Sequence, residues 1–314
     1  MFEKFNDQFD EKRAIYVKNL GAYSLADTME CGQCFRYERV EREDGIDEYI
    51  TVVGKELIRV AQKECGELIF PEMTDDVFTS VAVPYFALDR DLEAVRKNIA
   101  DNTDSEWLKA AADFGAGIAI LRQDPWETII SFIISQNNNI PRIRKIVGEI
   151  SSAYGTNLSI LNDYNSCPLK FINGTPSTDA CKSCGRCYTF PTAEDILKNP
   201  ENLLPSKPGF RYGYILDAAE KIANGDVDIE KIESENRYEY TLETLKTIKG
   251  IGDKVASCAA LFGFGNLEAF PIDVWMKRAI DTYFDGKLDP TTLGPYAGIA
   301  QQYIFHYIRN EDKN

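Results

Sequence analysis

Residues 245–280 have the sequence LKTIKGIGDKVASCAALFGFGNLEAFPIDVWMKRAI. Apolar residues recur at helical spacing on both sides of the tight Gly-Ile-Gly turn at residues 250–252. Glycines in such a turn can adopt positive φ, and they leave the N–H groups at the start of the second helix open to an anion. The pattern therefore predicts a helix-hairpin-helix in which Gly250 and Gly252 contact a DNA phosphodiester without reading base sequence.

Two residues add possible chemistry to this binding motif. Lys254 lies in the first turn of the second helix, where a positive charge is disfavoured and the neutral amine that attacks carbon is favoured. Asp273 follows 19 residues later, and its carboxylate can stabilise a developing sugar cation or accept a proton. Alone, the lysine would be taken for a surface residue and the aspartate for a helix N-cap. Together with the hairpin they predict an active site.

This stretch resembles the helix-hairpin-helix-Gly/Pro-Asp superfamily of DNA glycosylases, in which a lysine at the hairpin exit marks the bifunctional glycosylase/lyase members. Residues 31–36 (CGQCFR) are similar to the Gly-Gln-x-Phe-Arg signature of 8-oxoguanine DNA glycosylases. Residues 122–125 (RQDP), residues 137–139 (NNN) and Gln301 with Phe305 are similar to later segments of that family. The matches run in order along the chain and leave out only a cysteine-rich insert.

The resemblance implies a base pocket. Gly32 would offer its carbonyl to the N7–H of 8-oxoguanine, a donor that guanine lacks because guanine presents an acceptor there. Phe305 and Cys258 would sandwich the flipped base, and Gln301 would bond its Watson–Crick edge. Lys254 would attack C1′ and form a Schiff base that leads to β-elimination, assisted by Asp273, with no cofactor needed for catalysis.

The resemblance also implies contacts to the strand opposite the lesion. Asn137, Arg142 and Arg211 would hold the estranged cytosine, whose acceptors suit an arginine fork. Phe210 occupies a position where family members often have a tyrosine that wedges the duplex, and an apolar ring still fills a base step. Trp275 stands where a histidine is common, so a phosphate contact is in question. The predicted partner is double-stranded DNA containing 8-oxoguanine.

Four cysteines lie within 21 residues: Cys167, Cys181, Cys184 and Cys187. Such clustering in an intracellular-looking chain favours a metal over disulfides. A tetrahedral zinc site in a loop is the simplest interpretation, with an iron–sulfur cluster or free or disulfide-bonded cysteines as alternatives. Cys31 and Cys34 could form a C-x-x-C pair, but their place beside Gly32 favours free thiols.

The order of patterns predicts an α+β protein with two domains. Short β-branched or aromatic runs within residues 14–88 predict an antiparallel sheet, and the periodicity is helical from residue 89 onward. We expect a TATA-binding-protein-like β domain over residues 1–110 and a helical domain over residues 111–314, with the cysteine insert at about residues 165–190.

The net charge of −15 argues against general affinity for nucleic acids. We therefore expect weak, salt-sensitive binding through backbone amides and a few cations. No signal peptide or membrane span is evident, so we expect a cytoplasmic monomer. A monofunctional alkylated-base glycosylase, a non-catalytic damaged-DNA binder and a metal-dependent interaction module built on the cysteine loop remain as alternative functions.

Overall fold

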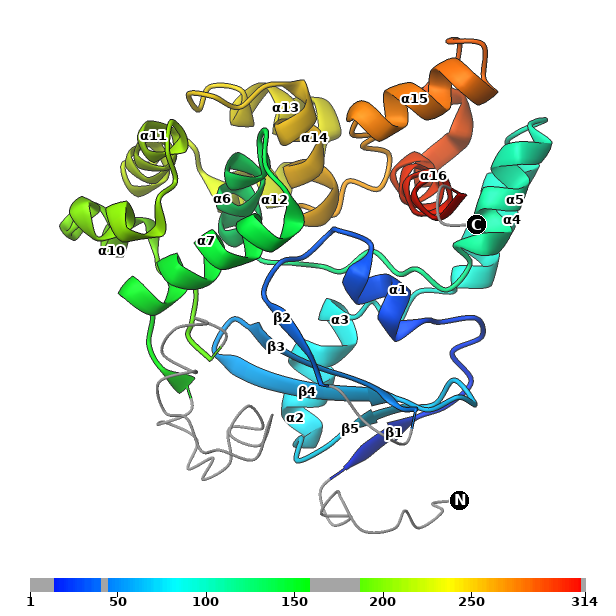
Figure 1. Ribbon diagram of the computed structural model, residues 1–314, viewed down its shortest axis with the longest axis horizontal. Helices are drawn as coiled ribbons and strands as arrows, with labels where there is room; N and C mark the ends of the chain where they lie inside the picture. Colours follow the sequence, from blue (N-terminus) through cyan, green and yellow to red (C-terminus); the bar gives the residue numbers. More distant parts are fainter. Residues whose placement is uncertain (1–13, 41–44, 159–186, 312–314) are drawn as a thin grey trace.

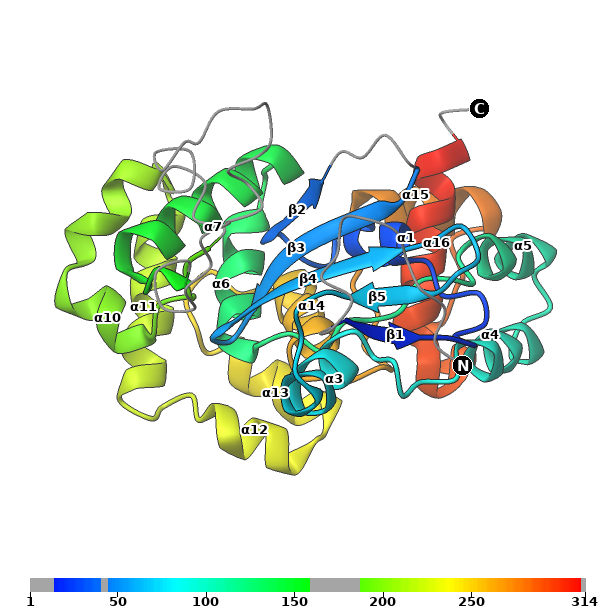
Figure 2. The ribbon, with the colours of Figure 1, turned by 90° about the horizontal axis from the view of Figure 1, so that it is seen from below.

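The computed structural model describes residues 14–40, 45–158 and 187–311. A small antiparallel sheet lies on one side of the molecule and a larger set of helices on the other (Figure 1). Figure 2 shows the sheet from the side away from the helices that carry the hairpin. The predicted α+β class is confirmed.

The sheet has five strands: β1 (Ile15–Val17), β2 (Tyr37–Val40), β3 (Asp47–Val53), β4 (Glu56–Gln62) and β5 (Leu68–Phe70). Their order is β1-β5-β4-β3-β2, and every pairing is antiparallel. The buried side chains of Tyr49, Ile58 and Phe70 form a core with α1 (Leu25–Glu30) and α3 (Val83–Tyr85). The sheet therefore buries one face against the first helices of the chain.

Residues 14–88 were expected to form strands, in the runs 14–19, 33–40, 48–54 and 56–62. The structure differs in three places. Residues 25–30 form α1, and residues 75–85 form α2 (Asp75–Val77), the π-helical η2 (Phe78–Ala82) and α3. Residues 33–36 lie before β2 because their polar groups bond to distant segments instead of a neighbouring strand. β5 was not among the predicted strands.

The helical part begins with α4 (Leu92–Asp101) and α5 (Glu106–Phe114). Its other elements are α6 (Pro125–Ser135), α7 (Ile140–Tyr154), α10 (Ala193–Lys198), η4 (Pro200–Ser206), α11 (Arg211–Ala223), α12 (Ile229–Glu235), α13 (Tyr238–Leu245), α14 (Asp253–Phe262), α15 (Val274–Tyr283), η5 (Pro290–Tyr296) and α16 (Ala297–Glu311). The α6 helix is buried on nearly every side and packs against α7, α11 and α14. It is thus the centre of the helical core.

Helices α4 and α5 pack against C-terminal elements, because α5 contacts α16 and α4 contacts η5. The hydrophobic core around α6 accordingly includes Val95, Ile99 and Leu108. The boundary expected near residue 110 stays a prediction, but the segment at residues 92–114 shares its core with the end of the chain.

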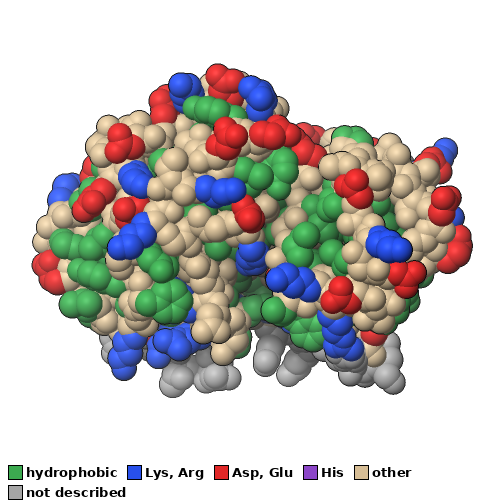
Figure 3. All heavy atoms as spheres, turned by 90° about the horizontal axis from the view of Figure 1, so that it is seen from above, with side chains coloured by type: hydrophobic (Ala, Val, Ile, Leu, Met, Phe, Trp, Pro, Cys, Tyr) green, Lys and Arg blue, Asp and Glu red, His purple; other side chains and the backbone are tan. Residues whose placement is uncertain are grey.

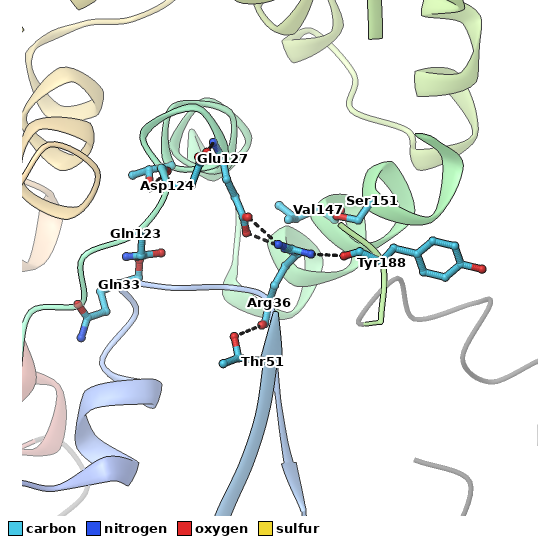
Figure 4. A network of polar contacts seen from close by, with 10 residues as sticks. Gln33, Arg36, Thr51, Gln123, Asp124, Glu127, Val147, Ser151 and Tyr188 are labelled. Carbon is cyan, nitrogen blue, oxygen red and sulfur yellow. Dashed lines mark hydrogen bonds and ion pairs between the residues drawn. The ribbon is translucent and has the colours of Figure 1, made fainter. Parts of the chain in front are cut away.

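A buried ion pair joins the sheet to the helical part (Figure 4). Arg36, 3% exposed, donates through Nε and Nη2 to the two carboxylate oxygens of Glu127 on α6, both at 2.6 Å. Its Nη1 donates to the carbonyl of Tyr188 at 2.6 Å, and Oγ1 of Thr51 on β3 donates to the backbone carbonyl of Arg36. Such a bidentate pair fixes the direction of both side chains, and so fixes the segment that leads from residue 31 into the sheet.

Candidate active site

The predicted hairpin is confirmed: α13 ends at Leu245, and α14 begins at Asp253. Gly250 has φ 83°, and a Cβ there would lie 2.3 Å from the ring of Tyr214. Glycine is therefore required both by backbone conformation and by space. Gly252 is exposed and caps α14 without a side-chain hydrogen bond, so the first N–H groups of that helix remain open to an anion.

A cavity of about 790 Å³ lies beside this hairpin. Both predicted catalytic residues, Lys254 and Asp273, line it. The four predicted base-recognition residues line the same cavity: Gly32, Cys258, Gln301 and Phe305. Its size lies within the range of ligand sites, and a single nucleotide fits such a volume. The structure thus brings together residues separated by more than 270 positions in sequence.

The side chain of Lys254 lies over an aromatic ring. Its Nζ is 5.1 Å from the ring centre of Phe132 on α6, and that ring stacks on Phe262 at 5.4 Å. Burial raises the pKa of the Cys258 thiol, an effect that the neighbouring Lys254 opposes. Cys258 is therefore a neutral, apolar wall of the cavity, and the predicted nucleophilic amine of Lys254 lies beside it.

Asp273 is the N-cap of α15, and its Oδ1 accepts a hydrogen bond from the N–H of Met276 at 2.8 Å. The side chain nevertheless lines the cavity across which Lys254 lies. One carboxylate oxygen thus takes part in the cap. The cap holds the carboxylate in one orientation at the cavity wall.

The predicted base-recognition residues come from three segments: the loop with Gly32, α14 with Cys258, and α16 with Gln301 and Phe305. Gly32 has φ 89°, and a Cβ there would lie 3.6 Å from Phe305. Gln301 is only 4% exposed, and its Oε1 has no hydrogen-bond partner within the described part of the chain. A buried amide oxygen without a partner is costly, so it is suited to a polar ligand in the cavity.

The residues expected to contact the opposite strand are only partly gathered at the cavity. Asn137 lines it in a left-handed conformation with φ 48°, and Arg142 is exposed one turn into α7. Arg211 is 3% exposed, and its guanidinium donates to the carbonyls of Gln136, Asn137 and Pro208. It therefore supports the loop that carries Asn137. Phe210, directly before it, is 55% exposed.

Sequence reasoning missed the roles of several residues. Phe132 forms the floor under Lys254, and Lys277 and Arg309 line the cavity, with the Arg309 guanidinium 5.1 Å from the Phe305 ring centre. Helical spacing could have found the last two, because each lies four residues after a predicted site residue. Trp275 also lines the cavity. Lys and Arg side chains lie around a central hollow on the face that carries α13, α14 and α15 (Figure 3).

The predictions concerned two sets of cysteines, the pair at residues 31 and 34 and the four of the insert. Cys31 and Cys34 are buried free thiols, as predicted, and burial raises the pKa of Cys31 to about 11. Cys167, Cys181 and Cys184 lie outside the described residues, whereas Cys187 is buried. Within the described ranges, no group of three or more His, Cys, Asp or Glu residues is arranged to hold a metal ion.

None of the helices in the described part of the chain has the length and apolar character that crossing a membrane requires.

Known proteins similar to this chain are 8-oxoguanine glycosylases and N-glycosylase/DNA lyases. The family model described as 8-oxoguanine DNA glycosylase, N-terminal domain, matches residues 15–129. The N-glycosylase/DNA lyase of Saccharomyces cerevisiae is 28% identical over 282 residues, which are 85% of this chain and 63% of that protein.

Two solved structures match nearly the whole chain. The 8-oxoguanine glycosylase/lyase of Clostridium acetobutylicum, in complex with double-stranded DNA containing cytosine opposite 8-oxoG, is 31% identical with a TM-score of 0.79, covering 98% of this chain and 99% of that one. MBOgg1 in complex with a low-affinity DNA ligand is 32% identical with a TM-score of 0.79, covering 99% and 100%.

A hairpin that presents open backbone amides, beside a cavity that holds an amine and a carboxylate, defines a DNA N-glycosylase that is also an abasic-site lyase. The similarities to known proteins show which family of this class the chain belongs to. The chain belongs to the 8-oxoguanine DNA glycosylase family.

Proposed function

We propose that this enzyme excises 8-oxoguanine opposite cytosine and cleaves the resulting abasic site through a Schiff base on Lys254. The observation that carries the proposal is that the amine, the carboxylate and the four base-recognition residues line one cavity. A base must leave the duplex stack to reach such a cavity. The open amides of the hairpin would hold the backbone nearby, because they can bind a phosphate without regard to sequence.

Recognition of the base would use the two polar groups that face the cavity. The carbonyl of Gly32 would accept a hydrogen bond from the N7–H of 8-oxoguanine, whereas guanine would place its own N7 acceptor against it. The unpaired Oε1 of Gln301 would accept from the Watson–Crick edge, which has donors at N1 and N2. The carbonyl of Gly32 favours the oxidised purine over guanine, because two acceptors facing each other in a buried pocket cost free energy. The amide of Gln301 selects a guanine-type Watson–Crick edge, which both purines share.

The chemistry would proceed in two stages. The lone pair of the Lys254 amine forms a bond to C1′ as the bond to the base breaks. The base leaves with the electron pair of the broken bond and takes up a proton that the alkylated amine releases. Asp273 stabilises the positive charge on the sugar during this step. The sugar ring then opens to a Schiff base, and loss of a C2′ proton expels the 3′ phosphate by β-elimination.

For the strand opposite the lesion, Asn137 and Arg142 would contact cytosine, with Phe210 filling the gap in the duplex. Phe210 is well exposed, and an apolar ring can be inserted between base pairs at small cost to the free protein. Arg211 would reach cytosine only after exchanging the backbone carbonyls that it now binds. The proposal therefore assigns Arg211 a supporting role in the free enzyme and a reading role in the complex.

The test uses duplexes with 8-oxoguanine opposite each of the four bases, incubated with and without borohydride. We expect strand cleavage to be fastest opposite cytosine and a covalent adduct to form when borohydride is present. Lys254→Gln should abolish both. A trapped adduct that survives this substitution would refute the assignment, and base release without strand cleavage would indicate a monofunctional glycosylase. Binding of the lesion with no release would indicate a damage-recognition protein.

We further propose zinc at the cysteine insert, with Cys167, Cys181, Cys184 and Cys187 as ligands. The support is their spacing, together with the burial of Cys187, the ligand that lies within the described ranges. The metal would be structural, since the cavity lacks a cluster of metal-binding side chains among its described residues. Elemental analysis of protein prepared without chelator tests this, and zinc-free protein with full activity would contradict it.

A further inference from the structure

The three successive backbone carbonyls of residues 31–33 differ in their hydrogen bonding. The carbonyl of Cys31 accepts a hydrogen bond from Nε2 of Gln302 at 2.9 Å. The carbonyl of Gln33 accepts one from Nε2 of Gln123 at 2.8 Å, and Figure 4 shows these two side chains beside each other. No residue in the described part of the chain donates to the carbonyl between them, that of Gly32, which lines the cavity.

The side chain of Gln33 fixes the same segment from the other side. Its Nε2 donates to the carbonyls of Thr28 and Ala119, both at 2.8 Å, and its Oε1 accepts from the N–H of Leu121 at 2.8 Å. Gln33 is fully buried and Gln302 is 3% exposed, so water does not compete strongly for these bonds. The residues before and after Gly32 are thus held to three separate parts of the chain.

A glycine needs such support more than any other residue. Gly32 has φ 89° and lacks a Cβ, so local sterics leave the direction of its carbonyl poorly determined. Because peptide groups are planar, fixing the carbonyl of Cys31 also fixes the N–H of Gly32. Fixing Gln33 in turn limits the rotation of the peptide group that carries the Gly32 carbonyl.

We propose that Gln302 is a positioning residue for base recognition. Together with Gln123, it aims the carbonyl of Gly32 into the cavity. Gln302 is adjacent to Gln301 on α16, so the same helix that presents the unpaired amide of Gln301 also fixes the position of the carbonyl. The hydrogen bond from Gln302 to the carbonyl of Cys31 thereby ties the segment of Gly32 to the helix that carries Gln301. This inference rests on the proposed function, because it concerns recognition of 8-oxoguanine.

The experiment compares Gln302→Met with a matched control, Gln62→Met. Gln62 on β4 is a partly buried amide that donates to the carbonyl of Tyr23 at 2.7 Å and accepts from the N–H of Leu25 at 2.7 Å, and it does not line the cavity. Three quantities are measured for each protein: single-turnover excision of 8-oxoguanine, cleavage of a preformed abasic site, and the unfolding temperature. The abasic substrate has no base, so its cleavage does not need the Gly32 carbonyl.

We expect Gln302→Met to lower excision of 8-oxoguanine about tenfold, the effect of losing one buried hydrogen bond, and to leave abasic-site cleavage within about twofold of wild type. Gln62→Met should change neither activity, although its unfolding temperature should fall about as far as that of Gln302→Met. Gln123→Met removes the other hydrogen bond of the pair and should show the same selective loss. Gln123→Met is the variant to measure if Gln302→Met does not fold.

Equal loss of both activities in Gln302→Met and Gln123→Met would show a merely structural role and overturn the inference, as would unchanged excision. If the wild-type enzyme cleaves abasic sites but does not release 8-oxoguanine, the proposed substrate is wrong and this inference fails with it. Wild-type release of 8-oxoguanine with no selective loss in the variants would reject the inference alone.

Discussion

At the residue scale, Asp273 combines a helix cap with a place in the cavity wall, and the two roles can be separated by substitution. Asn also caps helices, so Asp273→Asn should unfold at nearly the wild-type temperature. It removes the negative charge, however, so release of 8-oxoguanine should slow by about a hundredfold or more, whereas binding of the lesion should change little. Single-turnover excision and calorimetry measure the two effects.

The control for this substitution is Asp228→Asn. Asp228 caps α12, where it accepts a hydrogen bond from the N–H of Lys231 at 3.0 Å, and it does not line the cavity. It should leave excision unchanged. Excision at the wild-type rate in Asp273→Asn would remove the carboxylate from the mechanism, and a large fall in its unfolding temperature would show that the amide does not replace the cap.

Sequence could predict Lys254 and Asp273 because both belong to one contiguous motif with fixed spacing. It could not predict Gln302, whose partner is the carbonyl of Cys31, 271 residues away. Nor did it indicate Phe132, since an aromatic residue in an apolar helix is ordinary core until the helix is placed under the lysine. Contacts between remote segments leave no local pattern, so these residues become visible only in the folded chain.

At the element scale, the start of α11 presents an apolar ring to solvent. Phe210 is 55% exposed and packs edge-on against Tyr214 at 5.8 Å, the side chain that also excludes a Cβ at Gly250. We expect Phe210→Ala to change the unfolding temperature little, because little area is buried, but to weaken binding of lesion-containing duplex about tenfold by loss of the wedge. Equilibrium titration with labelled duplex measures this.

Phe114→Ala provides a comparison for this prediction. Phe114 is another exposed aromatic residue, 47% accessible, and it lies on α5 against His306 and Tyr307 instead of near the hairpin. Its loss should not alter affinity for DNA. Equal weakening by both substitutions would mean that exposed aromatic surface in general, and not the position of Phe210, accounts for binding.

Several elements followed closely from sequence. The run PWETIISFIIS at residues 125–135 has the pattern of a helix, and α6 begins and ends at these residues. Asp124 caps the helix, Pro125 occupies its first turn and the apolar run fills it. The sheet was predicted less well. Residues 33–36 have the apolar and aromatic composition of a strand, but Gln33 and Arg36 bond to α6 and to the segment before it, an effect of tertiary structure that overrides local propensity.

At the scale of the whole molecule, a chain of net charge −15 must bind a polyanion. Several basic side chains near the hairpin or the cavity form no ion pair with a described residue: Arg142, Lys249, Lys254, Lys277 and Arg309. Others are neutralised, as Lys246 is by Asp253 at 2.7 Å. Among the residues that line the cavity, three are basic (Lys254, Lys277 and Arg309) and one, Asp273, is acidic, so the cavity wall is positive although the molecule is negative. Composition alone could not predict this, because these residues come from different elements.

This arrangement predicts binding through few phosphates. With about four phosphate contacts, affinity for undamaged duplex should fall roughly a hundredfold between 50 and 200 mM salt. Lys277→Gln should reduce the slope of log affinity against log salt by about one unit, whereas Lys109→Gln, which removes a lysine that pairs with Glu106 on α5, should not. Fluorescence anisotropy measures these slopes. Tight, salt-independent binding to undamaged DNA would contradict the prediction.

The α16 helix carries Gln301, Gln302, Phe305 and Arg309, all of which line the cavity. An α-helix turns by about 100° per residue, so inserting or deleting one residue ahead of position 301 would rotate the entire set away from its target at once. Substitutions can change this helix one side chain at a time, but a change in its length cannot be absorbed. The residues that this helix presents to the cavity can therefore evolve by substitution, but only while the length of the helix stays the same.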